Sequence, residues 1–251
     1  MLRWSRTPQA QKSYVVCRYL DNPLLIGGKK FDLRVYVLVT SYRPLRAYVH
    51  RLGFCRFCTV NYTAITDSPE DLFVHLTNVS FQKQSKDYND VHGGKWTLEN
   101  LRVYIEGTRG KAASDKLFDD INWIFVQALK AVQGVMINDR HSFEMYGFDI
   151  LIDASLKPWL IEVNASPSLS ATTVSDRLLK ATVINDVFSI VFPDGEMLDV
   201  RAPHPPPENL GGFQLLFDES ACIDGAGGSA TGGLGDKKGL KAAGKKERLW
   251  R

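Results

Sequence analysis

Residues 147–164 decide the fold class, and they read G-F-D-I-L-I-D-A-S-L-K-P-W-L-I-E-V-N. Two runs rich in β-branched and aromatic residues flank a polar segment with a proline, which is the pattern of a β-hairpin. If the turn occupies residues 153–158 and the hairpin is symmetric, Asp149 lies directly opposite Glu162. Apolar side chains fall on both faces of the two strands, which predicts that the hairpin is buried.

The two facing carboxylates indicate a metal site. Like charges directly opposite each other in a ladder repel, and no residue in the immediate sequence neutralises this pair. Asn164 lies two residues after Glu162, on the same strand face, and adds a third oxygen. Mg²⁺ takes hard oxygen ligands, usually one or two carboxylates together with substrate phosphates. A solvated acid pair is the alternative, but the apolar surroundings favour a Mg-nucleotide platform because buried carboxylates need partners.

A second polar group lies on the strand predicted at residues 30–39. In K-F-D-L-R, the alternation places Lys30, Asp32 and Arg34 on one face. Arg34 is suited to a bidentate grip on a phosphate or a carboxylate. Arg56, on a neighbouring predicted strand, could converge with Arg34. An exposed stripe of ion pairs is the alternative interpretation of the same pattern.

The remaining motifs carry less information. Residues 75–78, H-L-T-N, are a compact polar run for which a turn with a capping Asn is the simpler interpretation. Cys55 and Cys58 form a C-x-x-C in a strand-like run, where residues three apart point to opposite faces, so we expect core cysteines. The absence of H-E-x-x-H, G-x-S-x-G, Walker A and G-x-G-x-x-G motifs removes the best support for protease, esterase, P-loop and Rossmann functions.

Composition sets the outer limits. The chain has 251 residues, of which 44% are hydrophobic, enough for one sizeable core. Seven of its Lys and Arg residues lie in residues 232–251, with two acidic residues, so the basic balance belongs to the tail and predicts no nucleic-acid-binding core. No apolar stretch approaches the roughly 18–20 residues of a membrane span, and no signal peptide is apparent.

The periodicity predicts an α+β fold with an antiparallel meander. Strands are expected at residues 30–39, 45–51 and 54–60, the last two joined by Leu52-Gly53, and a long loop at residues 81–94. Helices are expected at residues 97–107, opened by Thr97, at residues 114–136, capped by Ser114, and at residues 175–192, capped by Ser175 or Asp176. Residues 1–13 are expected to be irregular, residues 14–200 folded, and residues 201–251 a Pro/Gly-rich and then basic disordered tail.

Four segments together resemble the tubulin tyrosine ligase-like family, which are amino-acid ligases of the ATP-grasp fold. The segments are N-P-L-L-I-G-G-K-K-F-D-L-R-V-Y-V-L-V (22–39), H-L-T-N (75–78), Y-G-F-D-I-L-I-D (146–153) and K-P-W-L-I-E-V-N-A-S-P-S-L (157–169). The likeness extends over about residues 14–192, and stretches such as Y-R-P-L-R-A-Y and H-G-G-K-W-T are similar to the tubulin polyglutamylase branch.

The resemblance implies a role for each matching position. The implied metal ligands are Asp149, Glu162 and Asn164. The cations that would face the terminal phosphate and the reacting carboxylate are Arg34 and Arg56. The implied nucleotide contacts are Lys30, Asp32, His75, Thr77 and Asn78, together with the hinge Arg18, Tyr19 and Leu20, against which adenine would pack.

The implied function is an ATP- and Mg²⁺-dependent ligation of glutamate to glutamate side chains of the tubulin C-terminal tail, through an acyl phosphate. The implied partners are tubulin or microtubules, free glutamate and other subunits of a polyglutamylase complex, with neither nucleic acid nor membrane. The implied location is the cytoplasm and cytoskeleton, including the cilium axoneme or basal body.

The chain also departs from the family. Family members carry an N-terminal domain and a Gly-rich segment with a phosphate-binding lysine before the hinge, whereas here the hinge begins at Arg18. We therefore expect an ATP-grasp central and C-terminal catalytic region at residues 14–200, with the N-terminal part of the family fold missing. The alternative functions are a non-catalytic module that binds microtubules or complex partners, and a ligase for glycine or tyrosine.

Overall fold

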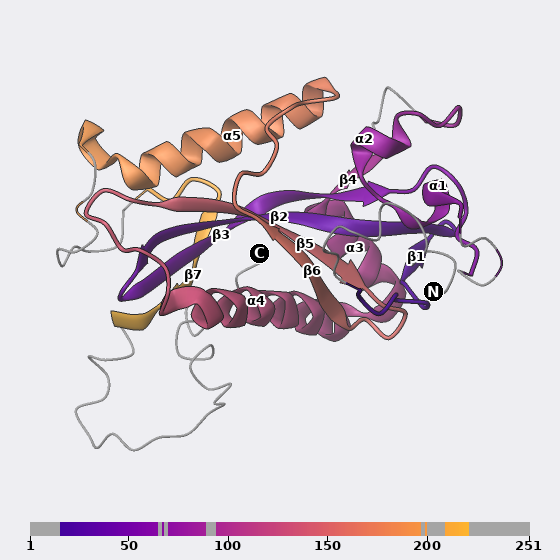
Figure 1. Ribbon diagram of the computed structural model, residues 1–251, viewed down its shortest axis with the longest axis horizontal. Coiled ribbons are helices and arrows are strands. Elements are labelled where there is room, and N and C mark those ends of the chain that lie inside the picture. Colours follow the sequence, from indigo (N-terminus) through magenta and orange to yellow (C-terminus); the bar gives the residue numbers. More distant parts are fainter. Residues whose placement is uncertain are drawn as a thin grey trace, which may run out of the picture.

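The computed structural model describes residues 16–64, 67, 70–88, 94–196, 199 and 209–220 (Figure 1). Its centre is an antiparallel sheet with the strand order β4-β3-β2-β5-β6, in which β1 also pairs with β2 and β7 with β3. The strands are β1 (Leu25–Ile26), β2 (Lys29–Tyr42), β3 (Leu45–Phe57), β4 (Lys95–Thr97), β5 (Glu144–Ile152), β6 (Pro158–Asn164) and β7 (Phe213–Asp218). The helices are α1 (Leu72–His75), α2 (Val79–Gln82), α3 (Leu98–Arg109), α4 (Lys111–Gln133) and α5 (Val174–Val191), with a 3₁₀ turn at Pro193–Gly195. The predicted α+β class with an antiparallel sheet and flanking helices is confirmed.

Helices cover both faces of the sheet, as Figure 1 shows with α4 on one side and α5 on the other. We call these the α4 face and the α5 face. The core of the α4 face joins strand residues such as Val35, Phe148 and Ile150 to helix residues such as Leu101 and Phe125. The smaller core of the α5 face joins Tyr36, Leu38, Tyr48 and Phe54 to Val183, Val187 and Ile190 of α5. Alternate residues of β2 therefore enter two different cores.

The strand β3 is continuous, so the predicted turn at Leu52-Gly53 is wrong. The pairing of β2 with β3 shifts register between Val35 and Val37, and the chain absorbs the irregularity in a bulge without reversing direction. Gly53 is required there by close packing: a Cβ atom would lie 2.6 Å from the Arg34 carbonyl oxygen and 2.7 Å from Leu98 Cδ1 at the start of α3. Glycine at position 53 is thus explained by close packing against the Arg34 carbonyl and Leu98, and not by a loop.

The helix boundaries agree with the prediction at one start and differ at two. The Thr97 side chain accepts a hydrogen bond from the Asn100 backbone N–H, as expected of the cap of α3. Helix α4 begins at Lys111, and Ser114 lies buried inside it, so Ser114 is not a cap. Helix α5 begins after Thr173, whose hydroxyl accepts from the Asp176 N–H. Within the described residues, no helix has both the length and the apolar composition of a membrane span.

The predicted hairpin is present, and Asp149 does pair with Glu162. The turn is held by Asp153, whose Oδ1 accepts hydrogen bonds from the backbone N–H groups of Ser155 and Lys157 and whose Oδ2 accepts from Trp159 Nε1. The ladder shifts register between Asp149 and Ile150, where Ile161 is the extra residue of a bulge. The hairpin is therefore not symmetric about the predicted centre, although the acid pair faces as expected.

The predicted burial of both hairpin strands is wrong for β6. Strand β5 is buried, but β6 lies at the edge of the sheet. Its residues Trp159, Leu160, Ile161 and Val163 are 38–54% exposed. Because of the bulge, Leu160 pairs with Ile150 and so faces away from the acids, contrary to the expectation of a regular ladder.

The predicted disordered tail contains an ordered strand. β7 (Phe213–Asp218) pairs with β3 from Arg46 to His50, and Phe213, Leu216 and Phe217 are buried. Its run F-Q-L-L-F does not alternate and its partner is more than 160 residues earlier, so no local pattern marks it. The expected loop at residues 81–94 begins with the end of α2. The expectations for residues 1–13 and 221–251 lie outside the described residues.

Candidate active site

Charged side chains form a row across the α5 face. They are Lys95 on β4, Arg56 on β3, Asp32 and Arg34 on β2, Asp149 on β5 and Glu162 on β6, and we call them the charged row. The strand register explains the row, because Lys95 pairs with Arg56, Arg56 with Asp32, Arg34 with Asp149 and Asp149 with Glu162. Residues that pair directly across strands point to the same face. The structure thus brings together the predicted stripe of β2, Arg56 and the acid pair.

Asp149 is the centre of the charged row. Arg34 donates to it in a bidentate arrangement, from Nε to Oδ1 at 2.5 Å and from a terminal nitrogen to Oδ2 at 3.1 Å. Arg56 donates to the same Oδ2 at 2.7 Å. Arg56 also binds Asp32 through two bonds, one of them from Nε to Oδ1 at 2.8 Å. The predicted convergence of Arg34 and Arg56 is confirmed.

These contacts favour the charged forms of Asp149 and Arg56. Burial alone would raise the pKa of Asp149, but the hydrogen bonds from Arg34 and the charge of Arg56 outweigh burial and hold the pKa below its usual value. Burial alone would lower the pKa of Arg56, but the bonds to Asp32 and the charge of Asp149 raise it. All four side chains are less than 10% exposed. Asp149 and Arg56 are therefore both charged at neutral pH.

The reasoning that led from the acid pair to a metal needs a correction. Arg34 and Arg56 neutralise Asp149, so a cation is not required to hold Asp149 beside Glu162. These arginines come from strands distant in sequence, which is why the hairpin alone did not reveal them. Among the described residues there is also no cluster of three or more His, Cys, Asp or Glu side chains with metal-binding geometry.

The oxygen donors nevertheless suit a hard cation. Within the described part of the chain, Asp149 Oδ1 accepts a hydrogen bond from Arg34 Nε alone, and Glu162 is exposed. Asn164 donates through Nδ2 to the Gly147 carbonyl and to Glu162 Oε1, both at 3.2 Å, which leaves its carbonyl oxygen directed elsewhere. Two carboxylates and an amide oxygen at one point of the sheet are the ligand types that Mg²⁺ prefers. The predicted residues therefore fit a magnesium site in their chemistry.

The predicted nucleotide contacts form a second group at the start of β2. Lys30 Nζ donates to the His75 carbonyl at 2.8 Å and to the Tyr19 hydroxyl at 3.2 Å. The Tyr19 hydroxyl also lies 2.7 Å from His75 Nδ1, and the Lys30 ammonium lies 4.8 Å from the centre of the Tyr19 ring. Burial lowers the pKa of Lys30, while Asp32, two residues further on the same face, opposes this shift.

The other predicted contacts are less closely engaged. Arg18 is exposed and Leu20 is half-buried in the irregular segment before β1. Thr77 is buried, whereas Asn78 is exposed. Asn78 occupies the N-cap position of α2 but makes no capping hydrogen bond with its side chain, so the capping role is not seen.

Cys55 and Cys58 are buried free thiols, as predicted. Cys58 Sγ donates to the carbonyl oxygens of Val74 and Leu76, and burial raises its pKa to about 12. These side chains are structural and not reactive at neutral pH.

Sequence reasoning missed the residues that extend the charged row beyond β3. Lys95 binds Asp176 at 2.7 Å, and Asp176 also binds Lys180. The alternation of K-W-T and the i,i+4 spacing of Asp176 and Lys180 on α5 were the available signals. Neither shows that β4 and α5 meet, because that contact is tertiary.

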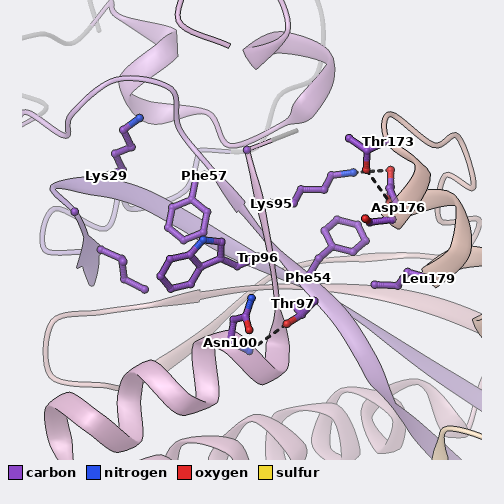
Figure 2. A pocket seen from close by; sticks show the side chains of 14 residues that line it. Lys29, Phe54, Phe57, Lys95, Trp96, Thr97, Asn100, Thr173, Asp176 and Leu179 are labelled. Carbon is purple, nitrogen blue, oxygen red and sulfur yellow. Dashed lines mark hydrogen bonds and ion pairs between the residues drawn. The ribbon is translucent and has the colours of Figure 1, made fainter. Parts of the chain in front are cut away.

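A cavity of about 740 Å³ opens at this end of the row, as Figure 2 shows. Its walls come from β3, β4, the turn between β1 and β2, and the first turns of α3 and α5. In Figure 2 the Lys95 side chain extends toward Thr173 and Asp176, while Phe57 and Trp96 lie on the other side of β4. The cavity thus adjoins the charged row at Lys95.

The sheet carries buried arginines and carboxylates on one face, next to a cavity. This arrangement is typical of a ligand-binding or catalytic site. The model of the tubulin-tyrosine ligase family matches residues 1–200. The chain therefore belongs to the tubulin-tyrosine ligase family, and the resemblance seen in its motifs is confirmed.

Several curated relatives are similar to the chain. A probable alpha-tubulin polyglutamylase, Ttll1, of Tetrahymena thermophila is 51% identical over 213 residues, which are 84% of this chain and 52% of the relative. A probable tubulin polyglutamylase, TTLL9, of Bos taurus is 45% identical over 225 residues, 90% of this chain and 47% of the relative. The tubulin polyglutamylase TTLL5 of Homo sapiens is 41% identical over 194 residues, 72% of this chain and 15% of the relative. The chain spans about half the length of the first two relatives.

Proposed function

We propose that this chain carries the catalytic core of an ATP- and Mg²⁺-dependent ligase that adds glutamate to glutamate side chains of the tubulin C-terminal tail. The observation that carries the proposal is the buried network of Arg34, Arg56, Asp32 and Asp149, continued by Glu162, on the α5 face. The names of the relatives, which are tubulin polyglutamylases, support the substrate.

The residues of the network match the needs of phosphoryl transfer. Arg34 and Arg56 already bind carboxylate oxygens in planar, charge-assisted geometry, and the same geometry suits phosphate oxygens. Lys30 lies at one end of the same strand face and provides a further cation. Two guanidinium groups held by buried carboxylates do not need to reorganise when negative charge develops next to them.

Asp149, Glu162 and Asn164 would hold the magnesium ion. When bound, Mg²⁺ would neutralise charge on the phosphate oxygens of the nucleotide. For this, Glu162 is exposed and Asn164 half-buried, and Asp149 Oδ1 accepts a hydrogen bond from one arginine whereas Oδ2 accepts from two. The proposed nucleotide contacts are Lys30, Asp32, His75, Thr77 and Asn78, with the hinge Arg18, Tyr19 and Leu20.

The proposed reaction has two balanced steps. The γ-carboxylate of the acceptor glutamate takes the γ-phosphoryl group of ATP, so that an acyl phosphate forms and ADP leaves. The amine nitrogen of free glutamate then bonds to the carbonyl carbon, phosphate leaves, and the amine loses a proton. Arg34 and Arg56 are placed to balance the charge of the transferred group and of the acceptor carboxylate.

The setting of the reaction is also a proposal. Tubulin or microtubules and free glutamate are the proposed partners, together with other subunits of a polyglutamylase complex, and the resemblance includes neither nucleic acid nor membrane. The proposed location is the cytoplasmic cytoskeleton, including the cilium axoneme or basal body.

Calorimetric titration of the chain with Mg-ATP tests the nucleotide site, with Asp149→Ala as the comparison. Binding that is present in the wild-type chain and lost in Asp149→Ala supports the proposal. Equal binding by both proteins contradicts the assignment of the charged row, and no binding by either contradicts the proposal for this chain. Glu162→Gln in an assay of glutamate incorporation into tubulin is the second test, because it should abolish Mg²⁺-dependent turnover while the fold stays intact.

A further inference from the structure

Gly147 lies where the charged row meets the proposed metal ligands. It is on β5, two residues before Asp149 and on the same α5 face. In the sheet it pairs with Tyr36 of β2 on one side and with Asn164 of β6 on the other. Its φ is not in the left-handed region that favours glycine. The position therefore requires glycine for space and not for backbone conformation.

Arg34 and Pro167 fill the space above Gly147. A Cβ atom on residue 147 would lie 3.0 Å from Arg34 Cδ, 3.2 Å from Arg34 Nε and 2.8 Å from Pro167 Cβ. Ordinary contacts between carbon atoms are about 3.5–4.0 Å long, so an added methyl group would displace one or both side chains by about 0.5 Å. The Arg34 stem has little freedom to move, because its Nε donates to Asp149 Oδ1 at 2.5 Å.

Pro167 reaches this space from the loop between β6 and α5. It is buried, whereas the other residues of 165–171 are exposed. Its Cβ and the Arg34 stem approach the same point, so the proline ring lies beside the contact between Arg34 and Asp149. A hydrogen bond between charged groups is stronger where water is kept away from it. The ring thus shields the bond that fixes the guanidinium.

The far end of this loop is fixed to α5 by hydrogen bonds. Lys180 donates from Nζ to the Ser170 carbonyl oxygen, and the Thr172 backbone N–H donates to Asp176 Oδ2 at 3.0 Å. Both Lys180 and Asp176 are buried residues of α5. Since β6 holds the near end, the loop is fixed on both sides of its buried proline.

The backbone of Gly147 also orients Asn164. The Asn164 Nδ2 group donates to the Gly147 carbonyl and to Glu162 Oε1, both at 3.2 Å. A backbone carbonyl only accepts hydrogen bonds, so the nitrogen of the amide must face it and the oxygen must face away. The same glycine therefore contacts an arginine of the charged row and a proposed metal ligand.

We propose that Gly147 and Pro167 are positioning residues that hold Arg34 and Asn164 in the geometry of the ligation. The reaction that these two side chains serve rests on the proposed function. Gly147 leaves room for the Arg34 stem and orients the Asn164 amide, and Pro167 closes the space above. Functional groups must be held to within about 0.5 Å of their productive geometry. The displacement that one methyl group would force at residue 147 is as large as this tolerance.

Exchange of the Arg34 Nε–H proton with water, measured by ¹⁵N–¹H NMR on the full chain, tests the inference. The signal is assigned by its absence from Arg34→Lys. In the wild type the exchange should be slow, because the proton is bonded to Asp149 and covered by Pro167. Gly147→Ala and Pro167→Ala should each accelerate it about ten-fold or more, the effect of weakening one hydrogen bond between charged groups.

Two controls separate positioning from general loosening of the fold. Arg56 Nε–H donates to Asp32 at 2.8 Å, further from residue 147, so its exchange should stay at the wild-type rate in both variants. Gly107→Ala adds a methyl group where nothing lies within 4 Å and should leave both signals unchanged. Pro167→Ala keeps the Cβ atom and lies in a loop, so it should fold even if Gly147→Ala does not.

Calorimetric titration with Mg-ATP connects the geometry to the proposed site. A misplacement of 1 Å can cost a factor of about 100 in function, so a shift of about half that size should weaken Mg-ATP binding about ten-fold in each variant. Gly107→Ala should bind as the wild type does.

The outcomes distinguish this inference from the proposed function. Faster exchange at Arg34 alone, together with weaker Mg-ATP binding, supports both. The same exchange result in a wild-type chain that does not bind Mg-ATP supports the positioning of Arg34 and contradicts the proposed function. The inference is overturned by unchanged exchange at Arg34 in the two variants, by equal acceleration at Arg34 and Arg56, or by variants that bind Mg-ATP as tightly as the wild type.

Discussion

Replacement of Arg56 by Met should strongly destabilise the fold. Arg56 is 7% exposed and binds both Asp32 and Asp149, so its removal leaves Asp32 buried without its cation and Asp149 with Arg34 alone. Removing one partner of a buried ion pair typically costs about 3–5 kcal/mol. This is a large part of the roughly 5–15 kcal/mol that stabilises an ordinary folded protein. For a chain of this size, it corresponds to a decrease in melting temperature of roughly 6–20 °C.

Chemical denaturation at pH 7, followed by circular dichroism, measures the effect. Arg177→Met is the matched control, because Arg177 is exposed on α5, and it should change the free energy of unfolding by less than about 0.5 kcal/mol. The double variant Asp32→Asn/Arg56→Met should recover at least half of the loss, since both members of the pair are then uncharged. The penalty of Arg56→Met should also shrink as the pH falls toward 4, because a proton can then neutralise the carboxylate that lost its partner. A loss below about 1 kcal/mol, or no recovery in the double variant, would refute the view that the network is a coupled buried unit.

Three further predictions concern the frame around the site. Gly211→Ala should destabilise the chain by more than about 2 kcal/mol. The φ of Gly211 is +55°, and a Cβ atom there would lie 2.3 Å from the Asp186 carboxylate. Gly107→Ala in α3, where nothing lies within 4 Å of the added Cβ atom, should be neutral or stabilising, and thermal melts of the two variants give the comparison. His50 is fully buried, and burial lowers its pKa although Asp186 opposes the shift. The unfolded state therefore binds the proton more readily, so the free energy of unfolding should decrease as the pH falls below the ordinary pKa of 6.5. Urea titrations across pH 5–8 should show this dependence of stability on pH in the wild type and a weaker one in His50→Gln. Asp153→Ala removes the acceptor that holds the hairpin turn and should cost about 1–2 kcal/mol, with faster amide exchange confined to β5 and β6; a uniform increase in exchange would speak against a local role.

The acid pair shows how far local sequence reasoning reaches. The turn residues and the strand pattern place Asp149 opposite Glu162, and the structure has this pairing. The neutralisation of Asp149 could not be found in the same way, because Arg34 and Arg56 are more than 90 residues away in sequence. Pairing of adjacent strands follows from local pattern, whereas charge compensation depends on which strands become neighbours.

The misplaced elements have the same origin. The pair Leu52-Gly53 resembles a turn because glycine is common in turns, but Gly53 is selected by the approach of Leu98 and the β2 backbone. Strand β7 depends on β3 for its pairing, and its own short run has no alternation to reveal it. Lys95 and Asp176 are individually ordinary, and only the packing of α5 against β3 and β4 makes them part of a site.

The bulge at Ile161 shifts the strand register between the hairpin turn and the acid pair. On the turn side Ile150 pairs with Leu160, and on the other side Asp149 pairs with Glu162, so one residue of slack lies between them. Deleting Ile161 would leave a regular ladder in which Asp149 still faces the same glutamate. The hairpin can thus lose this one residue without rotating Glu162 to the opposite side of the sheet.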